Sequence, residues 1–197
     1  MASLKPNLVK RVERLPKPTD VADAMQPLFE AISNAIHSTQ AKFGENVARL
    51  GRVHVEVSIN RRKENVWAVV EDNGVGLDAA NWEAFTTTDT DNKIDIGGKG
   101  VGRLLWLDCF SQIEVASVFA EDDTRKERTF KFALSMENQI TDHKLENAPA
   151  SKPTGFRARF NGLKNNGYLA KFPGRKEYVF QHITSHFLPT FIGGRCP

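Results

Sequence analysis

The chain has 197 residues, 40% hydrophobic and 26% charged, so it is long enough to bury a core as one domain without disulfides or metal. Its 27 Lys and Arg residues against 24 Asp and Glu residues give a formal charge of +3, which alone does not indicate a polyanionic partner. Cys109 and Cys196 match no metal or disulfide spacing, and no apolar run approaches the roughly 20 residues of a membrane span. These features predict a cytoplasmic protein without a membrane segment.

The first part of the chain predicts an arm followed by a long helix. Residues 1–20 are polar and basic with three prolines, so we interpret them as an N-terminal arm, or a short helix near Asn7–Arg14, outside the core. Apolar residues then recur at helical spacing and predict an amphipathic helix from about residue 20 to Phe43. Pro27 lies inside this pattern and predicts either a kink or a helix that restarts there.

A β-hairpin is expected next. Val53–Ile59 alternates apolar and polar residues, Arg61–Asn65 is typical of a turn, and Val66–Glu71 is more uniformly apolar, which favours a central strand. The second strand runs directly into Asp72–Gly76. Asn73 and Gly74 favour a turn, but a turn alone does not explain a second glycine or an acid at the strand end.

The second half of the chain alternates short elements with polar loops. We expect helices at 78–85, from 104 onward and at 176–186, strands at 111–119, 128–135 and 156–160, and polar loops at 86–96 and 138–153. This order predicts an α+β fold, a two-layer sandwich with helices packed on one face of a mixed, mostly antiparallel sheet. We assign residues 21–188 to one domain and residues 189–197 to the start of a linker to a further region.

Two further patterns carry candidate chemistry. Glu30 and Asn34 project from one face of the long helix, and His37 continues that face. A glutamate can orient and deprotonate a water, and an asparagine carbonyl is a hard oxygen ligand for Mg²⁺. Residues 97–102 form a GxxGxG pattern that opens an apolar helix, where backbone N–H groups and the helix dipole favour an anion. Lys99 and Arg103 add cations there.

ExxxN on the first long helix, DxGxG after a strand and GxxGxG after a polar loop occur here in that order. With these motifs the chain resembles the GHKL ATPase superfamily, which holds the gyrase B subunit, heat-shock chaperone ATPases, histidine kinases and the mismatch-repair protein MutL. The resemblance spans roughly residues 21–160, and the glycine motif is most similar to stand-alone prokaryotic members. It implies a Bergerat-type ATP-binding fold with ATP and Mg²⁺ as ligands.

The resemblance also implies a role for each matching residue. Asp72 would accept a hydrogen bond from the adenine amino group, with the backbone at Gly74 and Gly76 beside the base. Glu30 would be the general base for the attacking water, and Asn34 would bind Mg²⁺. The phosphates would be bound by Gly97, Gly98, Lys99, Gly100, Val101, Gly102 and Arg103.

Other positions follow from the resemblance less directly. Lys99 would contact the γ-phosphate and assist catalysis, and residues 86–96 would form a lid over bound ATP. Thr154 precedes Gly155 where many members have the order Gly-Thr, so it would replace the usual threonine or leave that adenine contact missing. His37 stands where the family has an acidic or small polar residue, and we expect a solvated or core-edge histidine.

These expectations favour a Mg²⁺-dependent ATPase with lid closure and ATP-linked dimerisation, and with a DNA or protein partner bound through a further C-terminal region. A histidine-kinase-like phosphotransfer module is an alternative, which Glu30 argues against. Another is a nucleotide-gated module with little hydrolysis that contacts nucleic acid or protein through the cations of Arg61–Lys63 and Lys164–Lys176.

Overall fold

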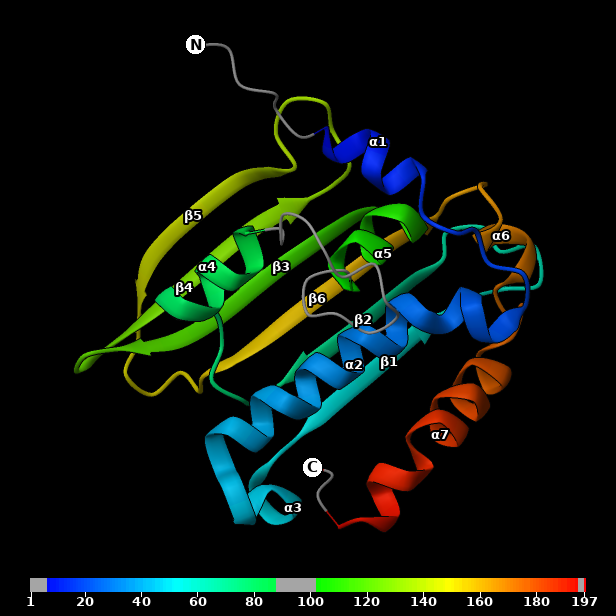
Figure 1. Cartoon of the computed structure of the whole chain (residues 1–197). Coiled ribbons are helices and arrows are strands. Elements are labelled where there is room, and N and C mark those ends of the chain that lie inside the picture. The colour runs from blue at the N-terminus through cyan, green and yellow to red at the C-terminus, as the bar shows by residue number, and fades with distance from the viewer. Residues whose placement is uncertain (1–6, 88–101, 195–196) are drawn as a thin grey trace.

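A computed structural model describes residues 7–87, 102–194 and 197. It has two layers, a six-stranded sheet in the order β1-β2-β6-β3-β4-β5 and a set of helices on one of its faces (Figure 1). The strands are β1 Val53–Ser58, β2 Trp67–Asp72, β3 Phe110–Glu121, β4 Thr124–Phe132, β5 Ile140–Ala148 and β6 Gly155–Leu163. The helices are α1 Leu8–Glu13, α2 Val21–Phe43, α3 Val47–Leu50, α4 Ala79–Thr86, α5 Gly102–Cys109, α6 Tyr168–Lys171 and α7 Lys176–Ile192, with the short 3₁₀ helix η1 Gly44–Asn46 between α2 and α3.

The predicted α+β two-layer fold is confirmed. Every strand pairing in the described part of the chain is antiparallel, so the sheet is simpler than the mixed one expected. β2 pairs with β1 on one side and β6 on the other, as its uniformly apolar sequence predicted. Its alternate residues Ala68, Val70 and Asp72 are buried, so the acid at the end of the strand lies on the same face as the apolar core residues.

Helix α2 crosses the sheet and buries one apolar face. The side chain of Asp20 caps it by accepting a hydrogen bond from the Asp23 backbone N–H at 2.9 Å. The helix does not restart at Pro27, because it begins at Val21 and continues through the proline. The carbonyl oxygen of Pro27 accepts a hydrogen bond from the indole N–H of Trp106 at 3.0 Å, which ties α2 to α5. The offset polar face of α2 therefore runs unbroken past Glu30.

The short helix expected near Asn7–Arg14 is present as α1, but it packs into the core rather than lying outside it as predicted. Val12 of α1 is fully buried within the main apolar cluster. Behind it, the ammonium of Lys17 lies 2.5 Å from Oδ1 of Asp108, a residue only 3% exposed. Leu8 and Leu15 also pack against this cluster, and the segment is too short to give a clear amphipathic repeat in the sequence.

Strand β5 was also not expected, because residues 138–153 read as a polar loop. Ile140–Ala148 pairs with β4 at the edge of the sheet, and seven of its nine residues are exposed. An exposed, charged edge strand lacks the alternation that identifies strands in sequence. Its His143 ring stacks on Trp82 of α4 at 4.9 Å, which holds that helix over β4 and β5.

At the C-terminal end, α7 runs to Ile192, six residues past the predicted end. Cys109 is a buried thiol, whereas Cys196 lies outside the described residues. Over the ranges that the structure describes, the helices are too short or too polar to cross a lipid bilayer.

Candidate functional site

The central acid of the site is Asp72, at the end of β2 and only 6% exposed. Its Oδ1 accepts hydrogen bonds from the Gly74 backbone N–H at 2.8 Å and from the Ser38 hydroxyl of α2 at 3.1 Å. Burial raises the pKa of Asp72 to about 6, and these hydrogen bonds offset part of the rise. A further hydrogen bond from the backbone of Phe156 in β6 also lowers this pKa, so residues of α2, the following loop and β6 all stabilise the carboxylate.

The glycines after Asp72 are required by packing of the protein itself. A Cβ at Gly74 would lie 2.5 Å from the backbone carbonyl carbon of Ser38, so residue 74 must be glycine for α2 to approach. Gly76 has φ +79°, and a Cβ there would meet the carbonyl of Val118 in β3. The resemblance implied that these glycines make room for a base, and the structure adds this protein-internal reason.

Thr154 lies in the site, although its order relative to Gly155 is reversed from the usual one. Its hydroxyl donates a 2.6 Å hydrogen bond to the carbonyl of Gly74, and its side chain is buried. A Cβ at Gly155 would clash with the carbonyl oxygen of Asp72, so threonine fits at 154 and not at 155. Thr154 therefore contacts the loop that follows Asp72.

Three polar residues that the sequence did not single out hold the same loop. Ser38 also accepts a hydrogen bond from the Val75 backbone N–H at 3.2 Å. Ser117 of β3 accepts from the Leu77 N–H at 2.8 Å and donates to the Gly155 carbonyl at 2.9 Å. Lys42 donates to the Asn73 carbonyl at 2.5 Å. Serines and lysines carry no periodic signal, so only the fold reveals these roles.

The polar face of α2 continues from Ser38 to Asn34 and Glu30, each one turn apart. Asn34 and His37 are exposed, and Glu30 is half-buried. Burial raises the pKa of Glu30, while the nearby His37 and His186 of α7 partly oppose this rise by favouring its charged form. The ring of His186 stacks on Phe29 at 3.9 Å, which positions it beside α2.

Glu30 also faces the start of α5. A Cβ built at Gly102 would lie 3.0 Å from the carboxyl carbon of Glu30, so the absence of a side chain at 102 allows this approach. The N-terminus of an α-helix favours a negative group, and here it is the end of the GxxGxG motif. Glu30 and Gly102, the last residue of the motif, are thus brought together.

Arg103, expected at the phosphates, contacts α4 here. Its guanidinium donates to the carbonyl of Ala84 at 2.7 Å and to that of Thr87, and lies 5.6 Å from the ring centroid of Phe85. It therefore caps the C-terminal end of α4. Gly97, Gly98, Lys99, Gly100 and Val101, together with most of the expected lid at 86–96, lie outside the described residues.

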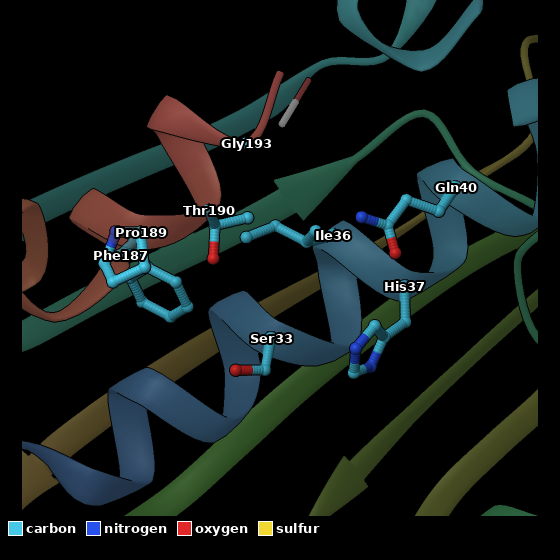
Figure 2. A pocket seen from close by; sticks show the side chains of 8 residues that line it. All are labelled: Ser33, Ile36, His37, Gln40, Phe187, Pro189, Thr190 and Gly193. Atoms are coloured by element: carbon cyan, nitrogen blue, oxygen red, sulfur yellow. The ribbon is translucent and has the colours of Figure 1, made fainter. Parts of the chain in front are cut away.

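A cavity of about 510 Å³ lies between α2 and the end of α7 (Figure 2). Its lining residues are Ser33, Ile36, His37, Gln40, Phe187, Pro189, Thr190 and Gly193. His37, to which no role was assigned, is thus a wall of this cavity on the flank of the Glu30 and Asn34 face.

The described residues can hold Mg²⁺ only together with the phosphates of a bound nucleotide. Within the described ranges, no three His, Cys, Asp or Glu residues are grouped to hold a metal ion. The exposed amide of Asn34 offers a single hard oxygen, and Mg²⁺ is commonly bound by one or two protein ligands, substrate phosphates and water.

A buried acid at a strand end, crowded glycines beside it and a carboxylate at a helix N-terminus together define an α+β nucleotide-binding domain. The family of histidine kinase-, DNA gyrase B- and HSP90-like ATPases matches residues 19–143, which is more than half of the chain. The chain therefore belongs to this family, and the predicted GHKL relationship is confirmed.

A solved structure with a similar fold agrees with this assignment. The chain resembles the ATPase region of Saccharomyces cerevisiae topoisomerase II bound to dexrazoxane, with a TM-score of 0.54 and 13% identity over 85% of this chain and 54% of that one. A second structure of that ATPase region has a TM-score of 0.48 and 15% identity over 75% of this chain and 42% of that one. The chain thus spans about half of the topoisomerase region that it matches. No curated protein matches it in sequence.

Proposed function

We propose that this chain binds ATP with Mg²⁺ and hydrolyses it to ADP and phosphate, as one domain of a larger ATP-driven protein. The observation that carries the proposal is the polar face of α2. Ser38 binds Asp72 at one end of this face, and Glu30 lies against Gly102 at the other. Eight residues of α-helix separate the two by about 12 Å, with Asn34 midway. One helix face therefore connects an acid suited to a base edge with a helix end suited to phosphate.

In this proposal Oδ2 of Asp72 accepts a hydrogen bond from the adenine amino group. Ser38 and the Gly74 N–H hold the other oxygen, and Thr154 holds the loop through the Gly74 carbonyl. Asn34 would hold Mg²⁺ through its amide oxygen, and the metal would neutralise phosphate charge. The N-terminus of α5 and residues 97–101 provide backbone N–H groups to the phosphates, and Lys99 contacts the γ-phosphate.

Glu30 is the proposed general base. It takes a proton from water as the water oxygen attacks the γ-phosphorus, and the bond from that phosphorus to the bridging oxygen of ADP breaks. Burial raises its pKa, which makes the carboxylate a better proton acceptor than a solvated glutamate. His37 and His186 favour its charged form, the form that a base needs at neutral pH.

The proposal includes closure of residues 86–96 over bound ATP, ATP-linked dimerisation and a cytoplasmic setting, as the family resemblance implies. It also includes a DNA or protein partner for the larger protein. These features are supported by the family alone.

Incubation with ATP labelled at the γ-phosphate tests the reaction. The proposal predicts Mg²⁺-dependent release of labelled phosphate with no label left on the protein. Stable label on a histidine would instead identify a phosphotransfer module, and neither product in the presence of tight ATP binding would identify a binding module.

A further inference from the structure

Two cationic runs that are far apart in the sequence meet at one end of the molecule. Lys63, in the turn between β1 and β2, donates hydrogen bonds from its ammonium to the carbonyls of Leu169 and Ala170 in α6, at 2.6 and 3.0 Å. A Cβ at Gly174 would lie 3.8 Å from Cα of Arg61 in the same turn. Residues 61–64 and 164–177 therefore form one continuous surface.

The N-terminal segment joins the same surface. A Cβ at Gly167, just before α6, would lie 3.5 Å from Cβ of Lys17 and 3.3 Å from Pro18. We call this surface, made of residues 17, 61–64 and 164–177, the basic end. In Figure 1 it is the side of the molecule where the β1–β2 turn, α6 and the start of α7 come together.

The basic end concentrates the positive charge of the chain. It holds eight of the 27 Lys and Arg residues but two of the 24 Asp and Glu residues, Glu64 and Glu177. Nineteen basic residues against twenty-two acidic ones remain elsewhere, so the rest of the chain is net negative although the whole is +3. The charges are therefore unevenly distributed: the basic end is net positive and the rest of the chain is net negative, although the formal charge of the whole chain is small.

Five of these cations are directed to solvent: Arg61, Arg62, Lys171, Arg175 and Lys176. Within the part of the chain that the structure describes, none of the five forms an ion pair. Exposed positive charges that share one surface and outnumber its acidic residues repel one another, and a polyanion reduces this cost.

The composition of the basic end fits a nucleic-acid backbone. Three of the five exposed cations are arginines, whose planar guanidinium groups bind phosphate with two parallel hydrogen bonds. The exposed amides of Asn60 and Asn165 stand in or beside the same segments and are common partners of phosphate oxygens. Tyr178 is 49% exposed with the Arg175 guanidinium 5.8 Å from its ring centroid, which offers an aromatic face beside the charges.

The basic end is separate from the proposed ATP site. β2 begins at Trp67, next to the β1–β2 turn, and ends at Asp72, so six residues of strand or roughly 17–20 Å lie between them. A polyanion bound here does not need the nucleotide pocket.

We propose that the basic end binds the phosphate backbone of a nucleic-acid duplex, and that it does so while the nucleotide site is occupied. This inference goes beyond the proposed ATPase activity and does not depend on it, because the two sites share no residue.

Fluorescence anisotropy with a random-sequence DNA duplex of about 30 base pairs tests the proposal, with an RNA duplex of the same length in parallel. The logarithm of the association constant should fall linearly with the logarithm of salt concentration, by about 0.9 for each phosphate contacted. The tighter of the two duplexes identifies the partner, and saturating ATP should not displace it.

Arg61→Gln, Arg62→Gln and Arg175→Gln together should weaken binding more than tenfold at low salt and make the salt slope shallower by about 2 to 3. The matched control replaces Arg125, Lys131 and Lys144, which lie on β4 and β5, by glutamine and changes net charge equally. This control should bind as the parent chain does, and thermal melting checks that both variants fold.

Equal loss in the control variant would overturn the proposal, because binding would then follow net charge alone. So would unchanged binding in the arginine variant, displacement of the duplex by ATP, or capture by vesicles with 20% phosphatidylserine without any binding to either duplex.

Discussion

The carboxylate of Glu30 in α2 lies directly against Gly102, the first residue of α5. The two residues come from different motifs, 72 positions apart in the sequence, and they meet at the N-terminus of α5. This contact is the closest link in the described structure between the presumed base and the presumed phosphate site.

Gly102→Ala should lower the rate of ATP turnover without lowering the stability of the fold. The new methyl group would meet the end of a flexible glutamate side chain, which can rotate away at small cost. We expect melting temperature and ATP affinity near those of the parent chain, but turnover 10- to 100-fold lower because the base is displaced by about 1 Å. Gly155→Ala is the contrasting variant, because its methyl group meets the backbone of Asp72 and should destabilise the fold. Parent-level turnover in Gly102→Ala would show that the position of Glu30 does not matter.

Asp72→Asn should stabilise the empty protein while weakening ATP binding. The pKa of Asp72 is raised from 3.8 to about 6, so the unfolded chain loses this proton at lower pH than the folded one. The contribution of Asp72 to stability is therefore present below about pH 4 and lost as pH rises through about 6. At pH 7.5 the asparagine variant should be more stable by up to about 3 kcal/mol, measured by urea unfolding.

The same substitution removes the acceptor for adenine. The Asn carbonyl would take the hydrogen bonds from Gly74 and Ser38, which leaves an NH₂ group facing the adenine amino group. ATP affinity should fall by at least tenfold. At pH values below about 6, where Asp72 gains a proton, the parent chain should also bind ATP more weakly. Calorimetry on both proteins separates this effect from the protonation of ATP itself. If the variant binds ATP as tightly as the parent chain, Asp72 only stabilises the turn and does not contact adenine.

Thr154→Val should reveal how much the buried hydroxyl contributes. It removes the 2.6 Å hydrogen bond to Gly74 and leaves that carbonyl without its donor. We expect a loss of about 1–3 kcal/mol in unfolding free energy and weaker ATP binding. Thr154→Ser keeps the hydroxyl and should retain both properties. If valine and serine behave alike, the hydrogen bond is not what positions the loop.

Val12→Ala tests whether the N-terminal segment is part of the fold. Val12 is completely buried, so the cavity left behind should cost about 2 kcal/mol in thermal or urea unfolding. Val9 is only half-buried on the same helix, and Val9→Ala should cost less than half as much. If neither substitution changes the free energy of unfolding measurably, the N-terminal segment is a loose arm outside the fold.

The elements that the sequence predicted correctly are those with a long, regular pattern. Helix α2 and the β1–β2 hairpin each repeat their apolar residues several times, and the position of each element followed directly. Strand β5 was missed because an edge strand can be almost wholly polar, and the burial of α1 was missed because its few apolar residues are too few to form a clear amphipathic pattern. In both cases the decisive contact is with a residue far away in the chain.

The candidate site divides in the same way. Asp72, Glu30 and Asn34 were selected from the order of the motifs, and their roles toward ATP stay predictions. Ser38 and Ser117 could not be predicted, since their hydroxyls matter only where α2 and β3 meet the loop after Asp72. The contact of Arg103 with the end of α4 likewise depends on where two helices meet.

The measurement that tests the central claim most directly is phosphate release by the parent chain and Glu30→Ala, with the ATP dissociation constant of each. We predict that the alanine variant binds ATP within about threefold of the parent and releases phosphate at least 100-fold more slowly, as expected for loss of a general base. Phosphate release at the parent rate in Glu30→Ala would contradict the account.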